Sequence, residues 1–143
     1  MSFRFTGDFA KLKHFQKKVQ QSPQVLQVIS ENLAEEAIDL VKQGFRDQAD
    51  PDGNAWKPKK KDDGRAILTG KTGRLKGGWH RRGVTRKGFR IGPSVTYAAP
   101  HQSGVPKRGL VARKMVPGKR LPLKWRKAFV ETAQEILEAH FSK

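Results

Sequence analysis

The sequence contains no cysteine, which excludes a disulfide scaffold and any metal site built from thiolates. Acidic residues are also scarce, since 13 Asp and Glu oppose 30 Lys and Arg and leave a formal net charge of +17. No apolar run approaches the roughly 18 residues that a membrane-spanning helix needs, and the N-terminus lacks the apolar stretch of a signal peptide. We therefore expect a basic intracellular protein with no membrane partner. The excess positive charge indicates an anionic partner or an acidic neighbouring subunit.

Apolar residues recur at helical spacing in three segments of the chain. They predict helices over about 8–20, 23–47 and 122–141. We interpret the long helix over 23–47 as a core-packing helix with a solvated polar face, which carries Glu31, Glu35, Glu36 and Asp39.

The length of 143 residues suits a single domain, 1–143, with a modest core. Its first seven residues predict a short extended segment with Phe3 and Phe5 on one face. The domain is expected to consist of a helical part (1–47), an exposed basic loop (48–64), a β-rich part (65–117) and a C-terminal helix (121–142). Trp56 is the apolar residue of the loop, and we expect it to fix the loop to the body of the protein.

Alternation with a period of two marks the centre of the β-rich part. Phe89 and Ile91 alternate with glycine and arginine, as in a strand with one buried face. A basic strand over 79–85 is expected to pair with it, and residues 95–97 predict a further strand after Pro93. Together these segments predict an α+β fold with long N-terminal helices, a small antiparallel sheet of about four strands and a C-terminal helix.

The segment that follows these strands carries one aromatic and two polar side chains into a tight corner. We interpret Tyr97, His101, Gln102 and Gly104 as a structural, hydrogen-bonded corner. His101 could in principle serve as a general base, but no acid or cysteine lies near it in the sequence. The structural interpretation is therefore preferred.

The positive charge is concentrated in two blocks. Residues 56–90 hold 13 Lys and Arg against two acids, and residues 104–127 hold nine and no acid. The first 55 residues, in contrast, hold seven bases and eight acids. Two such blocks around one sheet indicate a directed basic face, to which we assign Lys59, Lys60, Lys61, Arg81, Arg82, Arg86, Arg90, Lys107, Arg108 and Arg113.

Three motif-like features do not meet the requirements of the sites that they suggest. Residues 64–72 have five residues where a phosphate-binding loop needs four, and a lysine-rich loop precedes them instead of a strand. Residues 50–61 carry Ala55 and Lys61 where a calcium loop needs glycine and glutamate. The four histidines lack the spacing of a zinc site. We therefore expect no catalytic residue, no cofactor and no metal, and a protein that is not an enzyme.

Four segments, in order, resemble a known protein family. Residues 68–75 resemble its L-x-x-T-G-x-L segment, and residues 91–104 resemble its I-G-…-Y-A-x-x-H-Q-x-G segment. Residues 111–113 are similar to its P-A-R-x-F segment, although Val111 replaces the usual proline and Met115 stands where an aromatic residue is common. Residues 51–58 are similar to its P-x-G-x-x-W-x-P loop. The family is that of the virion morphogenesis or tail completion proteins of Mu-like and related tailed phages.

The resemblance implies a structural virion protein at the head–tail junction, present in the host cytoplasm during assembly. It implies a homo-oligomeric ring, for example a hexamer, with tail tube, terminator or connector proteins as partners. From the charge pattern, we expect residues 105–120 of one subunit to contact an acidic face of its neighbour, either near Glu31–Asp39 or near Glu131–Glu138. The alternative is a basic nucleic-acid-binding module, for DNA packaging or the ribosome, in which DNA or RNA phosphates contact the basic face.

Overall fold

The computed structural model describes residues 17–18, 20–70 and 72–141. The elements are, in order, α2 (Pro23–Asp47), α3 (Arg74–Gly77), β1 (His80–Thr85), β2 (Gly88–Gly92), α4 (Ala98–Ser103), the short 3-10 helix η1 (Pro106–Arg108) and α5 (Leu123–Phe141). The α+β class, the long helix before the sheet and the C-terminal helix are confirmed. The helix expected over 8–20 lies almost wholly outside the described residues, as do Phe3 and Phe5.

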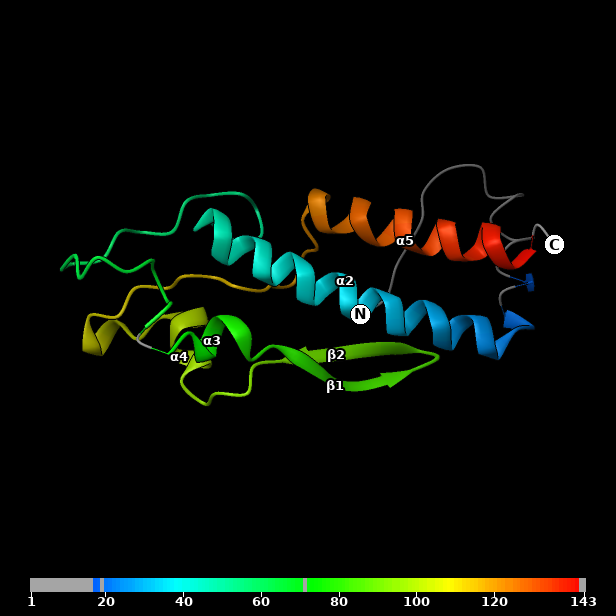
Figure 1. The fold of residues 1–143 in the computed structure, drawn as a ribbon, viewed down its shortest axis with the longest axis horizontal. Helices are drawn as coiled ribbons and strands as arrows, with labels where there is room; N and C mark the ends of the chain where they lie inside the picture. Colours follow the sequence, from blue (N-terminus) through cyan, green and yellow to red (C-terminus); the bar gives the residue numbers. More distant parts are fainter. Residues whose placement is uncertain (1–16, 19, 71, 142–143) are drawn as a thin grey trace.

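Helix α2 is the central element of the molecule. Figure 1 shows α5 packed along one side of α2 and the β1–β2 hairpin along another, and α2 contacts all three of these elements. The helix begins with Pro23 in its first turn, where a missing N–H costs nothing, and ends at Gln48 in the left-handed conformation (φ 53°). Because α2 is covered on two sides, its buried stripe is broad: Val25, Leu33, Ala34, Ala37, Ile38, Leu40, Val41 and Phe45.

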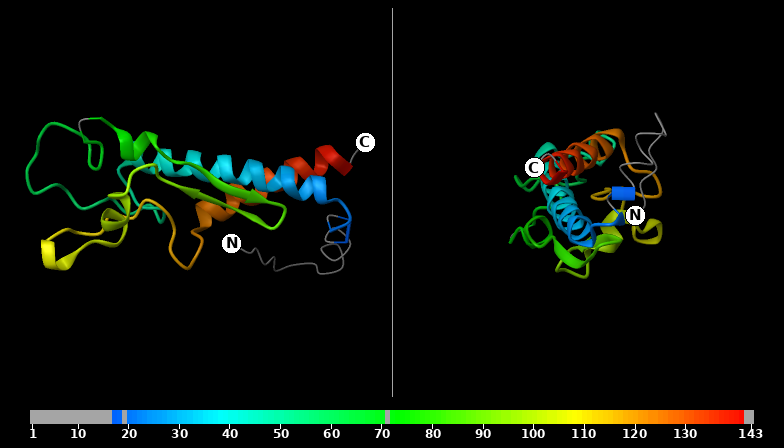
Figure 2. Two further views of the ribbon diagram at one scale, coloured as in Figure 1. Left: turned by 90° about the horizontal axis from the view of Figure 1, so that it is seen from below. Right: turned by 90° about the vertical axis from the view of Figure 1, so that its right-hand side faces the viewer.

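The core joins α2 to the aromatic residues of the hairpin and α5. The ring of Phe129 lies edge-on to Phe89 of β2 (5.9 Å between centroids) and to Trp125 one helical turn earlier (6.0 Å). Trp79, just before β1, and Leu75 of α3 are also buried in this cluster. Figure 2 shows the hairpin lying lengthwise on α2, so that this helix covers one face of the hairpin.

The sheet has two antiparallel strands in the described part of the chain, and the expectation of about four is wrong. Residues 95–97 form a turn into α4 instead of a strand. Helix α4 tolerates Pro100 because the proline lies in its first turn, where an amide N–H has no helical partner. Val105 and Leu110 form a single bridge that closes around η1, and residues 67–70 form a turn.

The loop after α2 has the structure that its turn residues predict. The backbone N–H of Asn54 donates to Asp50 Oδ1 (2.9 Å), and Ala49 and Ala55 pair across the turn. Trp56 is buried against Phe45, with 5.3 Å between ring centroids, and its indole N–H donates to the Lys114 carbonyl oxygen (2.9 Å). Trp56 therefore attaches this loop both to α2 and to the segment before α5.

Candidate functional site

Gln102 links α4 to the irregular segment 113–117. Its Nε2 donates to the Val116 carbonyl oxygen (2.8 Å), and its Oε1 accepts from the N–H groups of Met115 (2.7 Å) and Val116 (3.2 Å). One side chain thus satisfies three backbone groups that no sheet or helix satisfies. A backbone bond from Arg113 N to the His101 carbonyl oxygen (2.8 Å) lies beside it. Gln102 therefore connects α4 to the backbone of segment 113–117.

Gly104 ends α4 in a conformation that favours glycine (φ 75°). A Cβ atom at this position would lie 2.8 Å from the Ala112 nitrogen and 3.0 Å from the Leu110 carbonyl oxygen. The backbone of 110–112 therefore approaches the end of α4 as closely as it does only because residue 104 has no side chain. This close approach positions the turn that carries η1.

Tyr97 and His101, the other two large side chains of the predicted corner, contact each other through their rings. Tyr97 is 47% exposed, and its ring lies edge-on to the His101 ring with 6.4 Å between the ring centroids. His101 Nδ1 is buried and has no hydrogen-bond partner among the described residues. Burial, and to a smaller degree the charge of Arg113, lowers the pKa of His101 and keeps the imidazole neutral at pH 7.

Arg113 does not belong to an exposed basic face. Its side chain is buried (9% exposed), and its guanidinium donates from Nε to the Lys57 carbonyl oxygen (2.9 Å) and from Nη2 to the Pro58 carbonyl oxygen (3.1 Å). The sequence could not distinguish it from its exposed neighbours, because burial of this arginine depends on a loop more than 50 residues away. Its role is to hold that loop against the corner.

This attachment brings two basic loops to one end of the molecule. We call this end, formed by Lys57, Lys59, Lys60, Lys61, Lys107 and Arg108, the basic end. Figure 1 shows both loops together at the end of the molecule away from the C-terminus. A Cβ atom on Gly109 would lie 3.2 Å from Lys60 Nζ, so the loop that holds the lysine run touches the turn that holds Lys107 and Arg108. All members except the half-buried Lys59, which pairs with Asp63, are exposed.

The remaining predicted basic residues lie on the hairpin and do not continue this surface. Arg81 forms an ion pair with Glu35 of α2 (3.1 Å), and Arg82 donates a hydrogen bond to the Pro93 carbonyl oxygen. Arg86 lies at the hairpin turn, and Arg90 is exposed on β2. The ten residues assigned to one face are therefore divided among the basic end, the hairpin and one buried position.

Parts of the two acidic helix faces, in contrast, form a single surface. Packing of α5 on α2 brings together Glu36, Asp39, Glu131 and Glu135, which we call the acidic ridge. Burial, followed by the negative charges of the other three residues, raises the pKa of Glu36. The two groups of acidic residues are about 95 positions apart in the chain, and only the packing of the two helices joins them. Within the described residues no ion pair is formed by these four carboxylates, although the chain has a net charge of +17.

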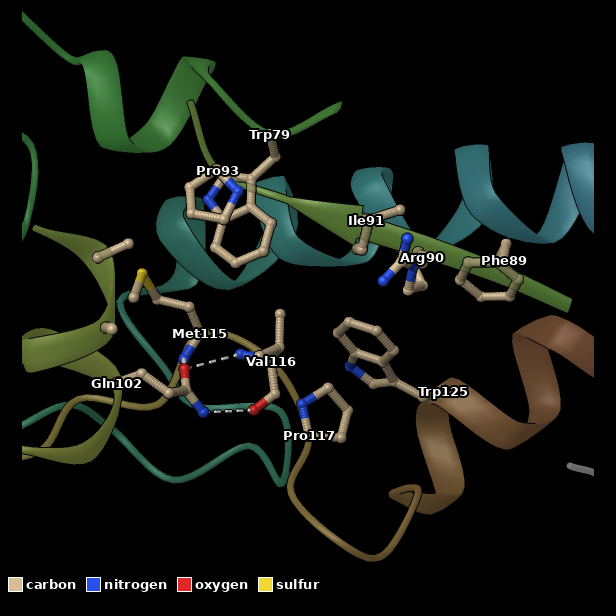
Figure 3. A pocket seen from close by; sticks show the side chains of 13 residues that line it. Trp79, Phe89, Arg90, Ile91, Pro93, Gln102, Met115, Val116, Pro117 and Trp125 are labelled. Carbon is tan, nitrogen blue, oxygen red and sulfur yellow. Dashed lines mark hydrogen bonds between the residues drawn. The ribbon is translucent and has the colours of Figure 1, made fainter. Parts of the chain in front are cut away.

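An open apolar groove of about 480 Å³ lies beside β2. Figure 3 shows Phe89, Arg90 and Ile91 of β2 on one side of it, and Met115, Val116 and the α5 residue Trp125 on the other. Ala37 of α2, Trp79 and the α4 residues Ala98, Ala99 and Gln102 complete much of its wall. The sequence did not predict this groove, because its residues come from six segments that only the fold brings together.

The described residues contain no group of three His, Asp or Glu side chains placed to hold a metal ion. No helix in the described ranges has the length and apolar character needed to cross a membrane. Of the segment that resembles a phosphate-binding loop, residues 67–70 form a turn with Leu68 and Gly70 at positive φ, while Lys71 lies outside the described residues.

Comparison with known proteins agrees with the four sequence segments described above. The profile of the phage virion morphogenesis family matches residues 8–141, which is most of the chain. No curated protein and no solved structure gave a significant match. The chain belongs to the phage virion morphogenesis family, and it is a virion-associated protein with a structural or assembly role.

Proposed function

We propose that this protein is a tail completion or head–tail connector (neck) protein, which forms a homo-oligomeric ring at the head-proximal end of the phage tail. Tail tube, terminator or connector proteins are its proposed partners on either side of the ring. The observation that carries the proposal is the separation of charge on one small chain. The basic end and the acidic ridge are formed by different loops and helices, and both are accessible to a second copy.

Copies of a chain with a net charge of +17 repel one another unless unlike surfaces meet. Contact between the basic end of one copy and the acidic ridge of the next removes this repulsion at both surfaces. Burial is the largest cause of the raised pKa of Glu36, and the negative charges of Asp39, Glu131 and Glu135 raise it further. A lysine or arginine of a neighbouring copy would offset these charges and lower the pKa.

A contact between two different surfaces of the same chain is heterologous. Such contacts generate closed rings when the rotation between neighbours closes, and open filaments when it does not. The basic end lies at one end of the long axis, whereas the ridge lies on the paired helices α2 and α5 (Figure 1). This placement supports a head-to-side arrangement in which the basic end of each copy contacts one neighbour and its acidic ridge contacts another.

Native mass measurement of charge-reversal variants tests this contact. At low salt (about 0.05 M), where charges are screened least, we expect Lys107→Glu/Arg108→Glu and Glu131→Lys/Glu135→Lys each to lose the oligomer. Combining the two pairs in one chain should restore it, because the two surfaces are then complementary again. Arg86→Glu/Lys87→Glu, at the hairpin turn, is the matched control and should assemble like the unmodified protein.

The same preparations distinguish the nucleic-acid alternative. A monomer that binds any DNA duplex tightly, with affinity that falls steeply as salt rises, would favour a DNA-binding module over the ring. Loss of that binding in Lys107→Glu/Arg108→Glu, without any change in self-association, would assign the basic end to phosphates. Self-association without DNA, sensitive to both charge-reversal pairs, favours the ring.

A further inference from the structure

The two outer edges of the hairpin differ in how open they are to pairing. Neither edge forms a backbone–backbone hydrogen bond with another part of the described chain. The β1 edge has a register shift between Arg81 and Gly83 and consecutive charged side chains, both of which discourage strand addition. β2 pairs regularly from Gly88 to Arg90 and has no proline before Pro93. Its outer edge is therefore the one at which a further strand can add.

The apolar groove runs beside this open edge. Phe89 and Ile91 belong both to β2 and to the groove wall, and the opposite wall is formed by Met115, Val116 and Trp125 (Figure 3). A strand added to β2 would carry alternate side chains on the same face as Phe89 and Ile91. Those side chains would enter the groove, so that backbone pairing and apolar burial would occur together, as in recognition of peptides by strand addition.

We propose that residues 1–7 of a neighbouring copy add to β2 as a third strand and place Phe3 and Phe5 in the groove. The sequence of this segment, Met-Ser-Phe-Arg-Phe-Thr-Gly, alternates apolar and polar residues over six positions and contains no proline. Phe3 and Phe5 are two residues apart, as are Phe89 and Ile91, so the spacing along the two strands matches. A cavity of about 150 Å³ holds one benzene ring, and a groove of about 480 Å³ therefore has room for two phenyl groups.

This inference rests on the proposed ring, because it supplies an apolar contact between the same neighbours. The described residues of a single chain leave the groove open, and assembly already requires contact between copies. Salt screens an exposed charge contact, whereas burial of phenyl groups and strand pairing do not depend on ionic strength in that way. Strand exchange would therefore hold the ring together, whereas the contact between the basic end and the acidic ridge would select the orientation of neighbouring copies.

Two full-length variants separate the donor segment from the acceptor groove. Phe3→Ser/Phe5→Ser removes the donor side chains, and Ala99→Trp fills the groove from an exposed position on α4. Their matched controls are Ser2→Ala/Thr6→Ala, on the other face of the same segment, and Ala139→Trp, at an exposed position of α5 outside the groove. By native mass, we expect both test variants to be monomers and both controls to assemble like the unmodified protein.

Mixing the two test variants identifies the source of the strand. One variant retains an open groove and the other retains the donor segment, so exchange between copies should yield a one-to-one heterodimer. If this mixture contains only monomers while the controls form rings, the inference is overturned, and residues 1–7 are assigned to the groove of their own chain. Rings formed by both test variants would also overturn it, and would leave the proposed ring function intact.

A synthetic peptide of residues 1–7 tests the groove even where no ring forms in solution. Added to Phe3→Ser/Phe5→Ser protein, it should change the fluorescence of Trp79 and Trp125, which line the groove. The peptide with serine at both phenylalanine positions should bind at least about tenfold more weakly. Introducing Ala99→Trp should abolish the binding. Equal binding of the two peptides, or binding unaffected by Ala99→Trp, would contradict the inference independently of the ring.

Discussion

Replacement of Gln102 by leucine tests whether this side chain holds segment 113–117 in place. The variant keeps the size and removes the partner of three backbone groups: the N–H of Met115 and both the N–H and the carbonyl of Val116. A polar group left unsatisfied in the interior costs about 1–3 kcal/mol. Because the groove beside Gln102 is open, water will replace part of these bonds, and we expect a loss of about 2–4 kcal/mol in the free energy of unfolding. For a chain of this length that loss lowers Tm by about 6–12 °C.

Urea denaturation and thermal unfolding followed by circular dichroism measure this loss. The matched control is Gln27→Leu on α2, whose side chain makes one bond of 3.3 Å, to Glu31. We expect this control to change the free energy of unfolding by no more than about 0.5 kcal/mol. Gln102 does not hold segment 113–117 in place if Gln102→Leu is as stable as the unmodified protein, or if the control loses as much stability as Gln102→Leu does.

Three further predictions concern the corner and the ridge. Gly104→Ala should destabilise the fold by about 1–3 kcal/mol, because φ is positive and the new Cβ atom meets the backbone of Ala112; unchanged urea unfolding would contradict this. Glu36→Gln should raise the free energy of unfolding at pH 7.5, because it removes a carboxylate whose pKa is raised in the folded protein. This increase should shrink as pH falls through the raised pKa of Glu36, since the folded protein then binds the proton. An increase that is the same at every pH would speak against the ridge. Because the pKa of His101 is lowered in the folded protein, the unfolded chain binds a proton at higher pH, and the free energy of unfolding should fall as pH drops below about 6.5. His101→Phe should lose this part of the pH dependence. Parallel pH profiles for the two proteins would rule out this role of His101.

The elements that the sequence predicted well are those set by local periodicity. Helix α2 was expected to end near Asp47 and does so, and the pairing of β1 with β2 across a short turn is as expected. Apolar spacing and turn residues act over a few positions, so they can be read without tertiary information. Trp56 was expected to fix its loop to the body of the protein, and its contacts with Phe45 and Lys114 confirm this.

The predictions that failed depend on which segments meet in three dimensions. Residues 95–97 are rich in strand-forming residues, but the turn into α4 and burial of Ala98 in the core decide their conformation. Arg113 lies in the same acid-free basic segment as Lys107 and Arg108, yet it is buried because its guanidinium donates hydrogen bonds to the carbonyl oxygens of Lys57 and Pro58. The acidic ridge and the apolar groove arise in the same way, because each is assembled from helices or strands that are distant in sequence.

We propose that this chain forms a ring at the head-proximal end of the phage tail. A cryo-electron microscopy reconstruction of that end in the assembled virion tests it most directly, because assembly in solution can require the tail as a template. We predict several copies in a closed ring, with the loop of Lys107 and Arg108 in each copy against Glu131 and Glu135 of the next. Absence of the chain from this location, or its presence as a single copy, would contradict the account.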